Sequence, residues 1–245
     1  MRKLSSNEIK SLKALASKKA RDEQGLFTVE GEKMVSEALR SKFEVVDVYR
    51  KDEIGEETME RISQLSSPSP VLAVLRQRPE TPAPTDKGLY LALDTIRDPG
   101  NLGTILRIAD WFGIRSVVAT KDTVELYNPK VVQATMGAIF RVDFHYADLP
   151  SFADAIMARG GSVYGTFLDG RNIYNRDLAT GEDSPVVIVI GNESNGISQA
   201  MASKVTDRLY IPPYPDGAQT SESLNAAVAT AVTVAEFRRR TWARL

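Results

Sequence analysis

Apolar residues in the first part of the chain recur with the periods of short strands and amphipathic helices, a pattern typical of a small α/β unit that ends near Arg76. Ser5 and Glu8 form a capping box, and the apolar residues after them recur at helical spacing. This pattern predicts one amphipathic helix over residues 6–20 with a basic outer face. A helix over residues 31–41 is expected to direct four side chains inward, namely Met34, Val35, Ala38 and Leu39. The remaining predicted elements are strands at 26–29, 45–49 and 71–75 and a helix at 56–65.

The segment 77–88 interrupts this pattern, because it contains three prolines and few apolar residues. Prolines and polar residues at this density are typical of an interdomain linker or an extended loop. We therefore expect one domain over residues 1–77, a linker over 78–87 and a second domain over 88–245.

The second part of the chain consists of longer strand–helix units. The stretch 186–190 (VVIVI) is apolar and β-branched throughout, as the central strand of a parallel sheet should be. Strands that alternate with helices predict an α/β fold class, with a parallel sheet covered by helices on both faces. Ligands bind such sheets at the carboxyl ends of the strands. The predicted strands are 90–93, 116–119, 142–146, 163–167, 186–190 and 209–211, and the predicted helices are 101–112, 128–139, 152–159 and 223–240.

Composition excludes several kinds of chemistry. The 245 residues include no cysteine and one histidine, His145. Disulfides, thiolate catalysis, cysteine-based metal sites and histidine-rich metal sites are therefore excluded, and we expect no metal. No apolar run approaches the length of about 18 residues that a membrane span needs, and the first residues lack the apolar core of a signal peptide. A cytoplasmic location without membrane attachment is expected.

Positive charge gathers near both ends of the chain, although the net charge is −1. Residues 1–21 carry seven basic side chains and one acidic one, and the last helix adds Arg238, Arg239, Arg240 and Arg244. Two interpretations stay open: solvated helix faces, or a surface that binds phosphates. The phosphate-binding candidates near the start of the chain are Lys10, Lys13, Lys18, Lys19 and Arg21.

Three segments, 93–114, 187–198 and 209–231, follow apolar strands and carry glycine and polar residues suited to a ligand site. The dinucleotide, P-loop and hydrolase-elbow signatures are missing from the sequence. Glycine allows backbone to approach a ligand closely, and an arginine such as Arg107 suits a phosphate or a ribose hydroxyl. Ordinary structural interpretations also stay open: the glycines in turns, Asn101 as a helix cap, and the stem of Arg107 covering apolar neighbours.

Taken together, these segments resemble the motifs of the SpoU/TrmH family of RNA ribose 2′-O-methyltransferases, within the SPOUT superfamily. The N-terminal part is similar to the substrate-binding domain of that family, an α/β fold shared with some ribosomal proteins, through Arg21, Phe27, Val29, Glu30 and Gly31. One departure is the segment 213–222, which is longer than usual in the family. The matching motif residues are Asp98, Asn101, Gly103 and Arg107, then Gly191, Asn192, Glu193 and Gly196, and finally Ile211, Pro212, Ser223, Leu224 and Asn225.

The resemblance implies a SPOUT fold with a deep trefoil knot, S-adenosyl-L-methionine as cofactor, and a homodimer with its active site near the subunit interface. It implies that Arg107 is catalytic. Because arginine is a poor base, we expect Arg107 to orient the target phosphate and hydroxyl and to stabilise the developing alkoxide. His145 lies away from the motifs, so we expect a core or surface role for it. The residues implied to hold this geometry are Asn101, Glu193, Ser223 and Asn225. The implied cofactor contacts are Thr166, Phe167, Gly191, Asn192, Gly196, Ile211, Ser223 and Leu224.

The implied reaction is methyl transfer to a ribose 2′-hydroxyl in RNA. The separate N-terminal domain favours ribosomal (23S) RNA over tRNA, and the basic first helix is expected to contact the RNA backbone through Lys10, Lys13, Lys18, Lys19 and Arg21. Two alternatives stay open: a tRNA ribose methyltransferase, and a non-enzymatic RNA-binding or ribosome-assembly factor of the same fold.

Overall fold

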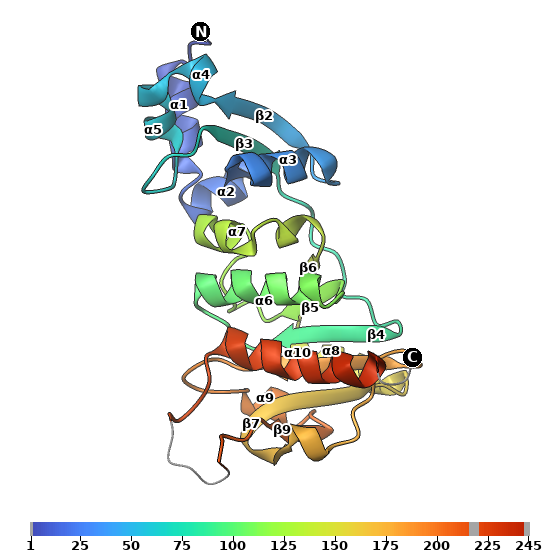
Figure 1. Ribbon diagram of the computed structural model, residues 1–245. Helices are drawn as coiled ribbons and strands as arrows, with labels where there is room; N and C mark the ends of the chain where they lie inside the picture. Colours follow the sequence, from blue (N-terminus) through green and yellow to red (C-terminus); the bar gives the residue numbers. More distant parts are fainter. Residues whose placement is uncertain (1, 216–220, 243–245) are drawn as a thin grey trace. The chain divides into compact units, whose positions relative to one another are not determined.

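The computed structural model describes residues 2–215 and 221–242, which group into two compact units (Figure 1). The N-terminal unit comprises Met1–Pro79 together with Glu125–Arg141. The C-terminal unit comprises Glu80–Val124 and Val142–Leu245. The chain therefore contributes to the N-terminal unit twice, whereas the division expected from the proline-rich segment is contiguous.

The N-terminal unit contains a three-stranded antiparallel sheet in the order β1–β3–β2. The central strand, β3, is buried along its length except at Arg76. Helices α1 and α5 pack on this sheet through a cluster that includes Leu12, Met59 and Leu72. The elements are α1 (Ser6–Ala14), α2 (Lys18–Gln24), β1 (Leu26–Glu30), α3 (Glu32–Arg40), β2 (Val45–Arg50), α4 (Lys51–Ile54), α5 (Glu56–Ile62) and β3 (Val71–Arg76).

Two expectations about these helices are wrong. The helix predicted over 6–20 is two helices, because α1 ends at Ala14 and the Ser17 hydroxyl caps α2 by accepting the Ala20 N–H at 3.3 Å. Leu39, expected to point inward, is 57% exposed. Leu39 lies in the last turn of α3. Helical spacing predicts which face of a helix is apolar, but it does not predict at which residue that face stops packing against the core.

The second segment of the N-terminal unit adds aromatic side chains to its core. The ring of Tyr127 lies 4.6 Å from that of Phe27, and the ring of Phe140 lies 5.6 Å from that of Phe43, between centroids. The helix predicted over 128–139 is broken into α7 (Pro129–Thr135) and a 3₁₀ turn, η1 (Ala138–Phe140), at two residues with positive φ. These contacts are the physical reason why 125–141 groups with the first part of the chain.

The C-terminal unit contains a six-stranded sheet in the order β6–β5–β4–β8–β7–β9, in which every pairing is parallel. This confirms the predicted α/β architecture, with the fully buried β8 at an interior position. The strands are β4 (Gly88–Leu93), β5 (Ser116–Ala119), β6 (Asp143–Tyr146), β7 (Ser162–Asn172), β8 (Pro185–Ile190) and β9 (Asp207–Tyr210).

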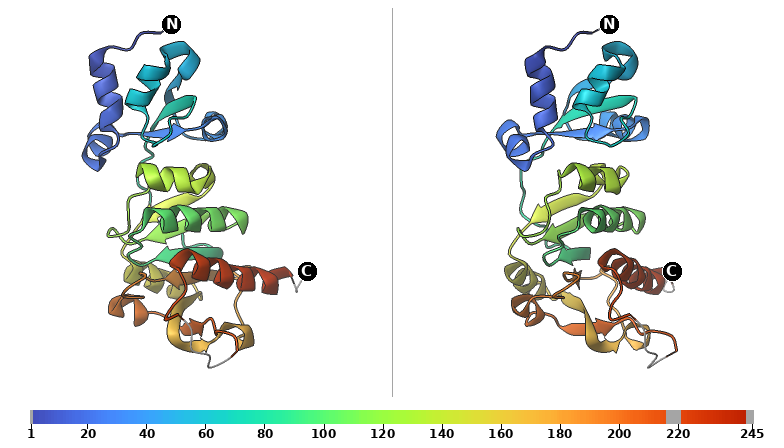
Figure 2. Two further views of the ribbon diagram at one scale, coloured as in Figure 1. Left: turned by 60° about the vertical axis from the view of Figure 1, so that its left-hand side comes forward. Right: turned by 90° about the vertical axis from the view of Figure 1, so that its left-hand side faces the viewer.

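Helices cover both faces of this sheet. Figure 2 shows α6 and α10 on one side and α8 and α9 on the other. Phe152 of α8 and Met201 of α9 pack on Val187 and Val189, whereas Phe237 of α10 stacks edge-on against Tyr164. The sheet is therefore buried on both faces, as its apolar strands require. The helices are α6 (Pro99–Trp111), α8 (Leu149–Ala158), α9 (Gln199–Ala202) and α10 (Ala226–Trp242), and η2 (Ile173–Asn175) is a 3₁₀ turn.

Within residues 2–215 and 221–242, no helix is long and apolar enough to cross a lipid bilayer. No group of three or more His, Cys, Asp or Glu side chains in the same ranges is placed to hold a metal ion.

Candidate functional site

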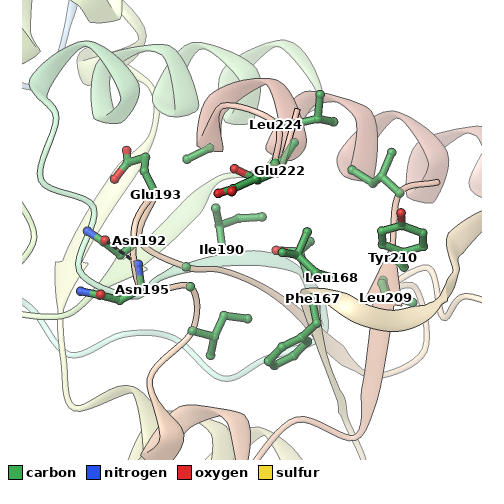
Figure 3. A pocket seen from close by; sticks show the side chains of 18 of the residues that line it. Phe167, Leu168, Ile190, Asn192, Glu193, Asn195, Leu209, Tyr210, Glu222 and Leu224 are labelled. Atoms are coloured by element: carbon green, nitrogen blue, oxygen red, sulfur yellow. Dashed lines mark hydrogen bonds between the residues drawn. The ribbon is translucent and has the colours of Figure 1, made fainter. Parts of the chain in front are cut away.

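A cavity of about 660 Å³ lies at the carboxyl edge of the parallel sheet (Figure 3). Its walls come from the middle of β7, the ends of β8 and β9, the loops after β8 and β9, and the start of α10. Sites for small organic ligands have volumes of roughly 300–1,000 Å³. The residues identified from the sequence that line the cavity are Thr166, Phe167, Gly191, Asn192, Glu193, Gly196, Ile211, Pro212, Ser223 and Leu224.

The loop after β8 is a tight turn that brings its backbone to the cavity wall. Asn192 and Gly196 exchange backbone hydrogen bonds of 3.0 and 2.9 Å. A side chain at Gly191 would lie 2.3 Å from the carbonyl carbon of Gly196, and Gly196 itself has a φ of +65°. The Asn192 side chain closes the turn, since its Oδ1 accepts the Ser194 N–H at 2.9 Å and its Nδ2 donates to the Thr95 carbonyl at 2.8 Å. Bulkier residues at the two glycine positions would therefore open the turn.

Three polar residues, one from each motif segment, form a hydrogen-bonded chain beside the cavity. Asn225 Nδ2 donates to Asn101 Oδ1 at 2.9 Å, and Asn101 Nδ2 donates to Glu193 Oε1 at 2.5 Å. Asn101 is buried, whereas Glu193 lines the cavity. The Glu193 carboxylate is therefore oriented by residues from two other segments of the chain.

The helices that carry or follow the two amides, α6 with Asn101 and α10 after Asn225, begin at the same edge of the sheet. The Asp98 carboxylate caps α6 by accepting the Asn101 N–H at 2.8 Å, and Pro99 occupies the first turn. The Asn225 side chain accepts the Ala227 N–H at 2.9 Å, so α10 begins three residues later than the predicted 223. Because α6 and α10 pack against each other, their first residues are fixed relative to one another.

Arg107 lies on the exposed side of α6 and is not among the described residues that line the cavity. Thr104 and Trp111 share this side, and Trp111 is 85% exposed. Across the ranges that the structure describes, no side chain pairs with the Arg107 guanidinium. The group is therefore open to solvent.

Four of the five expected RNA-binding residues are exposed. Lys10 and Lys13 extend from α1, and Lys18 and Lys19 extend from α2. The two α2 lysines pair with acidic residues one turn later, at 2.5 Å for Lys18 with Asp22 and at 3.9 Å for Lys19 with Glu23. The positive potential of the first helix is thus less compensated than that of the second.

Arg21 requires a correction. Its side chain is 2% exposed, donates to the carbonyls of Leu15 at 2.7 Å and Ala16 at 2.9 Å, and forms an ion pair with Glu125. A guanidinium enclosed in this way cannot reach an RNA phosphate. Arg21 instead holds the end of α1 and the second segment of the N-terminal unit together.

The arginines of the last helix also make internal contacts. Arg238 donates to the carbonyls of Phe112 at 2.7 Å and Gly113 at 3.2 Å. Arg239 and Arg240 pair with Glu236 at 2.7 and 2.8 Å. These contacts favour a structural role over phosphate binding for the three arginines, and Arg244 lies outside the described residues.

His145 lies on β6, away from the cavity. Its side chain is buried, and its Nδ1 is 3.0 Å from the carbonyl oxygen of Thr81. An imidazole held in this way is a packing group of the edge strand.

Sequence reasoning missed two charged residues of the cavity wall, Glu222 and Arg208. Glu222 directly precedes the Ser223-Leu224-Asn225 motif, so its place in the sequence is a usable signal. Arg208 lies inside β9 and carries no such signal. Among the described lining residues, the charged groups are Glu193, Glu222 and Arg208, and the two carboxylates suit a ligand with positive centres.

A family model described as the SpoU rRNA Methylase family matches residues 88–235, and one described as the MRM3-like substrate binding domain matches residues 6–73. The chain is 32% identical to the 23S rRNA (guanosine(2553)-2′-O)-methyltransferase RlmP of Bacillus subtilis, with 94% of this chain and 96% of that protein covered.

Two solved structures match along nearly the whole chain. A protein of the TrmH family of RNA methyltransferases from Porphyromonas gingivalis is 38% identical, with a TM-score of 0.87 and coverage of 97% of this chain and 99% of that one. An AdoMet-bound rRNA methyltransferase from Sinorhizobium meliloti is 30% identical, with a TM-score of 0.86 and coverage of 98% of both chains.

Proposed function

This chain belongs to the SpoU rRNA methylase family, and from that premise we propose that it transfers a methyl group from S-adenosyl-L-methionine to a ribose 2′-hydroxyl of ribosomal RNA. The observation that carries the proposal is the convergence of three motif segments on one cavity, joined by Asn225, Asn101 and Glu193. The name of the Bacillus subtilis relative and the AdoMet in the Sinorhizobium meliloti structure support the reaction and the cofactor.

The cavity fits this cofactor by size and by charge. S-adenosyl-L-methionine carries two positive centres, a sulfonium and an ammonium, and the cavity offers two carboxylates, those of Glu193 and Glu222. The Gly191–Gly196 turn presents backbone, which can recognise a nucleobase edge without side-chain bulk. The cofactor contacts are proposed to be Thr166, Phe167, Gly191, Asn192, Gly196, Ile211, Ser223 and Leu224.

The bound cofactor supplies a methyl group activated by its sulfonium charge. The chain has to hold the ribose hydroxyl in line with that methyl group and favour loss of the hydroxyl proton. Arg107 is proposed to bind the target phosphate and stabilise the developing alkoxide, since a guanidinium stays charged and cannot serve as a base. Asn101, Glu193, Ser223 and Asn225 are proposed to hold this geometry at the cavity.

The substrate is proposed to be 23S ribosomal RNA. The N-terminal unit matches a substrate-binding domain, and exposed Lys10 and Lys13 are suited to phosphate contacts. A tRNA substrate and a purely RNA-binding role are the alternatives that the assay below distinguishes.

The acting form is proposed to be a homodimer built on the α6–α10 face, with the trefoil knot of the SPOUT fold in the C-terminal unit. That face exposes Trp111, Val228 and Trp242, large apolar groups that a second copy would cover. Arg107 lies on the same side of α6 as Trp111, outside the cavity of its own chain. We propose that Arg107 of one copy completes the site of the other copy.

The reaction is tested by tritiated methyl transfer to separate pools of unmodified 23S rRNA and tRNA. Label in alkali-resistant dinucleotides from rRNA is the expected result, because a 2′-O-methyl group blocks alkaline cleavage. Label only in tRNA would show that tRNA, and not ribosomal RNA, is the substrate. Absence of label from both pools and from precursor ribosomal subunits would favour the RNA-binding role.

The dimer is tested with hybrids of Arg107→Ala and Ile211→Trp, a substitution that fills the cavity. Hybrids isolated through two different tags should show roughly half of wild-type activity, since one of their two sites would be intact. The homodimer of each variant should be inactive, and Arg107→Ala should still bind the cofactor. Inactive hybrids would place Arg107 in the site of its own chain.

A further inference from the structure

Strand β7 makes an excursion at the cavity wall. Thr166 and Arg171 both pair with Leu209 of β9, so residues 167–170 leave the ladder between two paired positions. Leu168 in this excursion is 68% exposed, whereas Phe167 turns back and packs on the core. The excursion therefore places the Phe167 ring at the cavity.

Strand register explains how the ring is held. Gly165 pairs with Arg208, so both residues lie on one face of the sheet, and the Phe167 ring lies on that same face beside Gly165. A side chain at Gly165 would lie 2.6 Å from Cε2 of Phe167, so the ring fills the space that the glycine leaves. The ring thus lies directly over the strand backbone.

Arg208 fixes the face of this ring. Its guanidinium carbon lies 3.5 Å from the ring centroid, and its Nη2 donates to Asp169 Oδ1 at 2.5 Å. Asp169 belongs to the same excursion as Phe167. One guanidinium therefore binds both a ring and a carboxylate of the excursion, and it joins them to the neighbouring strand.

We propose that Arg208 is a positioning residue for the cofactor: together with Asp169, it holds Phe167 as a fixed wall against which the adenosine part of S-adenosyl-L-methionine binds. This inference rests on the proposed function. A planar guanidinium on an aromatic face suits the task, because a ring that is ordered before binding costs no ordering entropy when the nucleoside arrives. Lysine offers the charge without the planar face.

Isothermal titration of the full chain with two ligands tests the proposal. S-adenosylhomocysteine contains the carboxylate arm, and 5′-methylthioadenosine has the adenosine part without it. Arg208→Ala should weaken both ligands by a similar factor, roughly three- to thirtyfold, with kcat at saturating cofactor within about twofold of wild type. The affinities of Arg208→Lys for both ligands should fall between those of wild type and Arg208→Ala. Arg171→Ala, at an exposed neighbouring residue, is the matched control.

A double-variant cycle isolates the route through the ring. Phe167→Ala should weaken the binding of both ligands. The double variant Phe167→Ala with Arg208→Ala should bind them no more weakly than Phe167→Ala alone. Weaker S-adenosylhomocysteine with unchanged 5′-methylthioadenosine would overturn the proposal in favour of direct carboxylate binding. A change confined to the KM for RNA, or a fall in kcat together with thermal stability, would also overturn it. Failure of wild-type protein to bind S-adenosylhomocysteine would instead refute the proposed function.

Discussion

The side-chain amide of Asn225 makes hydrogen bonds both to the start of α10 and to the candidate site. Its Oδ1 accepts the N–H groups of Ala227 and Val228 and so begins α10, whereas its Nδ2 donates to Asn101. Serine or aspartate would satisfy the helix equally well but would lack the amide donor. At the residue scale, the hydrogen bond to Asn101 therefore requires an amide at position 225, whereas the helix start does not.

Asn225→Asp separates these two roles. We expect the free energy of unfolding to stay within about 1 kcal/mol of wild type, because aspartate also caps helices. Methyl transfer should fall by about a hundredfold, since the carboxylate would face Asn101 Oδ1, and a flipped Asn101 would turn its oxygen toward Glu193. Urea denaturation and initial rates measure the two effects.

The control is Asn128→Asp, at a residue that caps α7 by accepting the Lys130 N–H at 2.9 Å. It should preserve both stability and rate. An Asn225→Asp enzyme with wild-type rate would show that the chain of amides does not orient Glu193 for the reaction.

At the element scale, α10 ends in a charged cluster that stabilises its last turns. Arg239, and then Arg240, hydrogen-bond to Glu236 and lower the pKa of that carboxyl group. Because the folded pKa lies below the unfolded value of about 4.3, the ionised carboxylate stabilises the folded state above that pH. The contribution is lost as the pH falls through the lowered folded pKa.

Glu236→Gln should therefore destabilise the protein in a pH-dependent way. We expect a loss of about 1 kcal/mol at pH 7, a modest value because water screens the exposed Arg239, and a progressively smaller loss below about pH 4. Urea denaturation from pH 7 to 3.5 measures it, with the exposed Glu60→Gln as control. A loss that stays constant across this range would contradict the assignment.

The first two helices differ in how much of their positive charge is available. Lys18 and Lys19 on α2 have acidic partners, Asp22 and Glu23. For Lys10 and Lys13 on α1, no ion pair is present within the described part of the chain. If this surface binds RNA, α1 should therefore contribute more than α2.

Salt dependence of RNA binding tests this difference. Replacing Lys10 and Lys13 with Gln should reduce the slope of log K against log salt by about 1 to 2, because each phosphate contact accounts for roughly 0.7–0.9. The same change at Lys18 and Lys19 should reduce it less. Filter binding at several KCl concentrations measures the slopes, and equal slopes for wild type and both variants would exclude this surface from RNA binding.

At the scale of the whole molecule, the N-terminal unit depends on two distant parts of the chain. Arg21 pairs with Glu125 in the interior, and Phe27 packs on Tyr127. A buried guanidinium and carboxylate are each costly to desolvate, so removal of one leaves the other without compensation. This ion pair therefore couples the folding of the two segments.

Arg21→Ala should lower the free energy of unfolding by about 3 kcal/mol or more, whereas Arg21→Met combined with Glu125→Met should lower it less. Guanidinium denaturation measures both. Arg2→Ala, which breaks the more exposed pair with Asp47, should cost less than about 1 kcal/mol. A double variant as unstable as Arg21→Ala would show that lost packing, rather than an unpaired charge, causes the effect.

The sequence by itself determined what depends on neighbouring residues. Period-2 and period-3.6 patterns located most strands and helices, and the apolar strand 186–190 predicted a sheet covered on both faces. Glycine and polar residues after strands indicated where the cavity lies, because the carboxyl ends of parallel strands share one edge. The break between α1 and α2 at Ser17 and the short helices α4 and α9 escaped detection, since a single turn has too little period to recognise.

The tertiary structure decided what depends on residues far apart in the chain. Burial of Arg21 requires Glu125, the orientation of Glu193 requires Asn101 and Asn225, and the place of Arg208 requires the excursion of β7. None of these partners lies within a helical turn or a hairpin of the other, so no local period encodes the contact. Side-chain packing between segments selects them, and for that reason the chemistry of each charged residue became clear only in the folded chain.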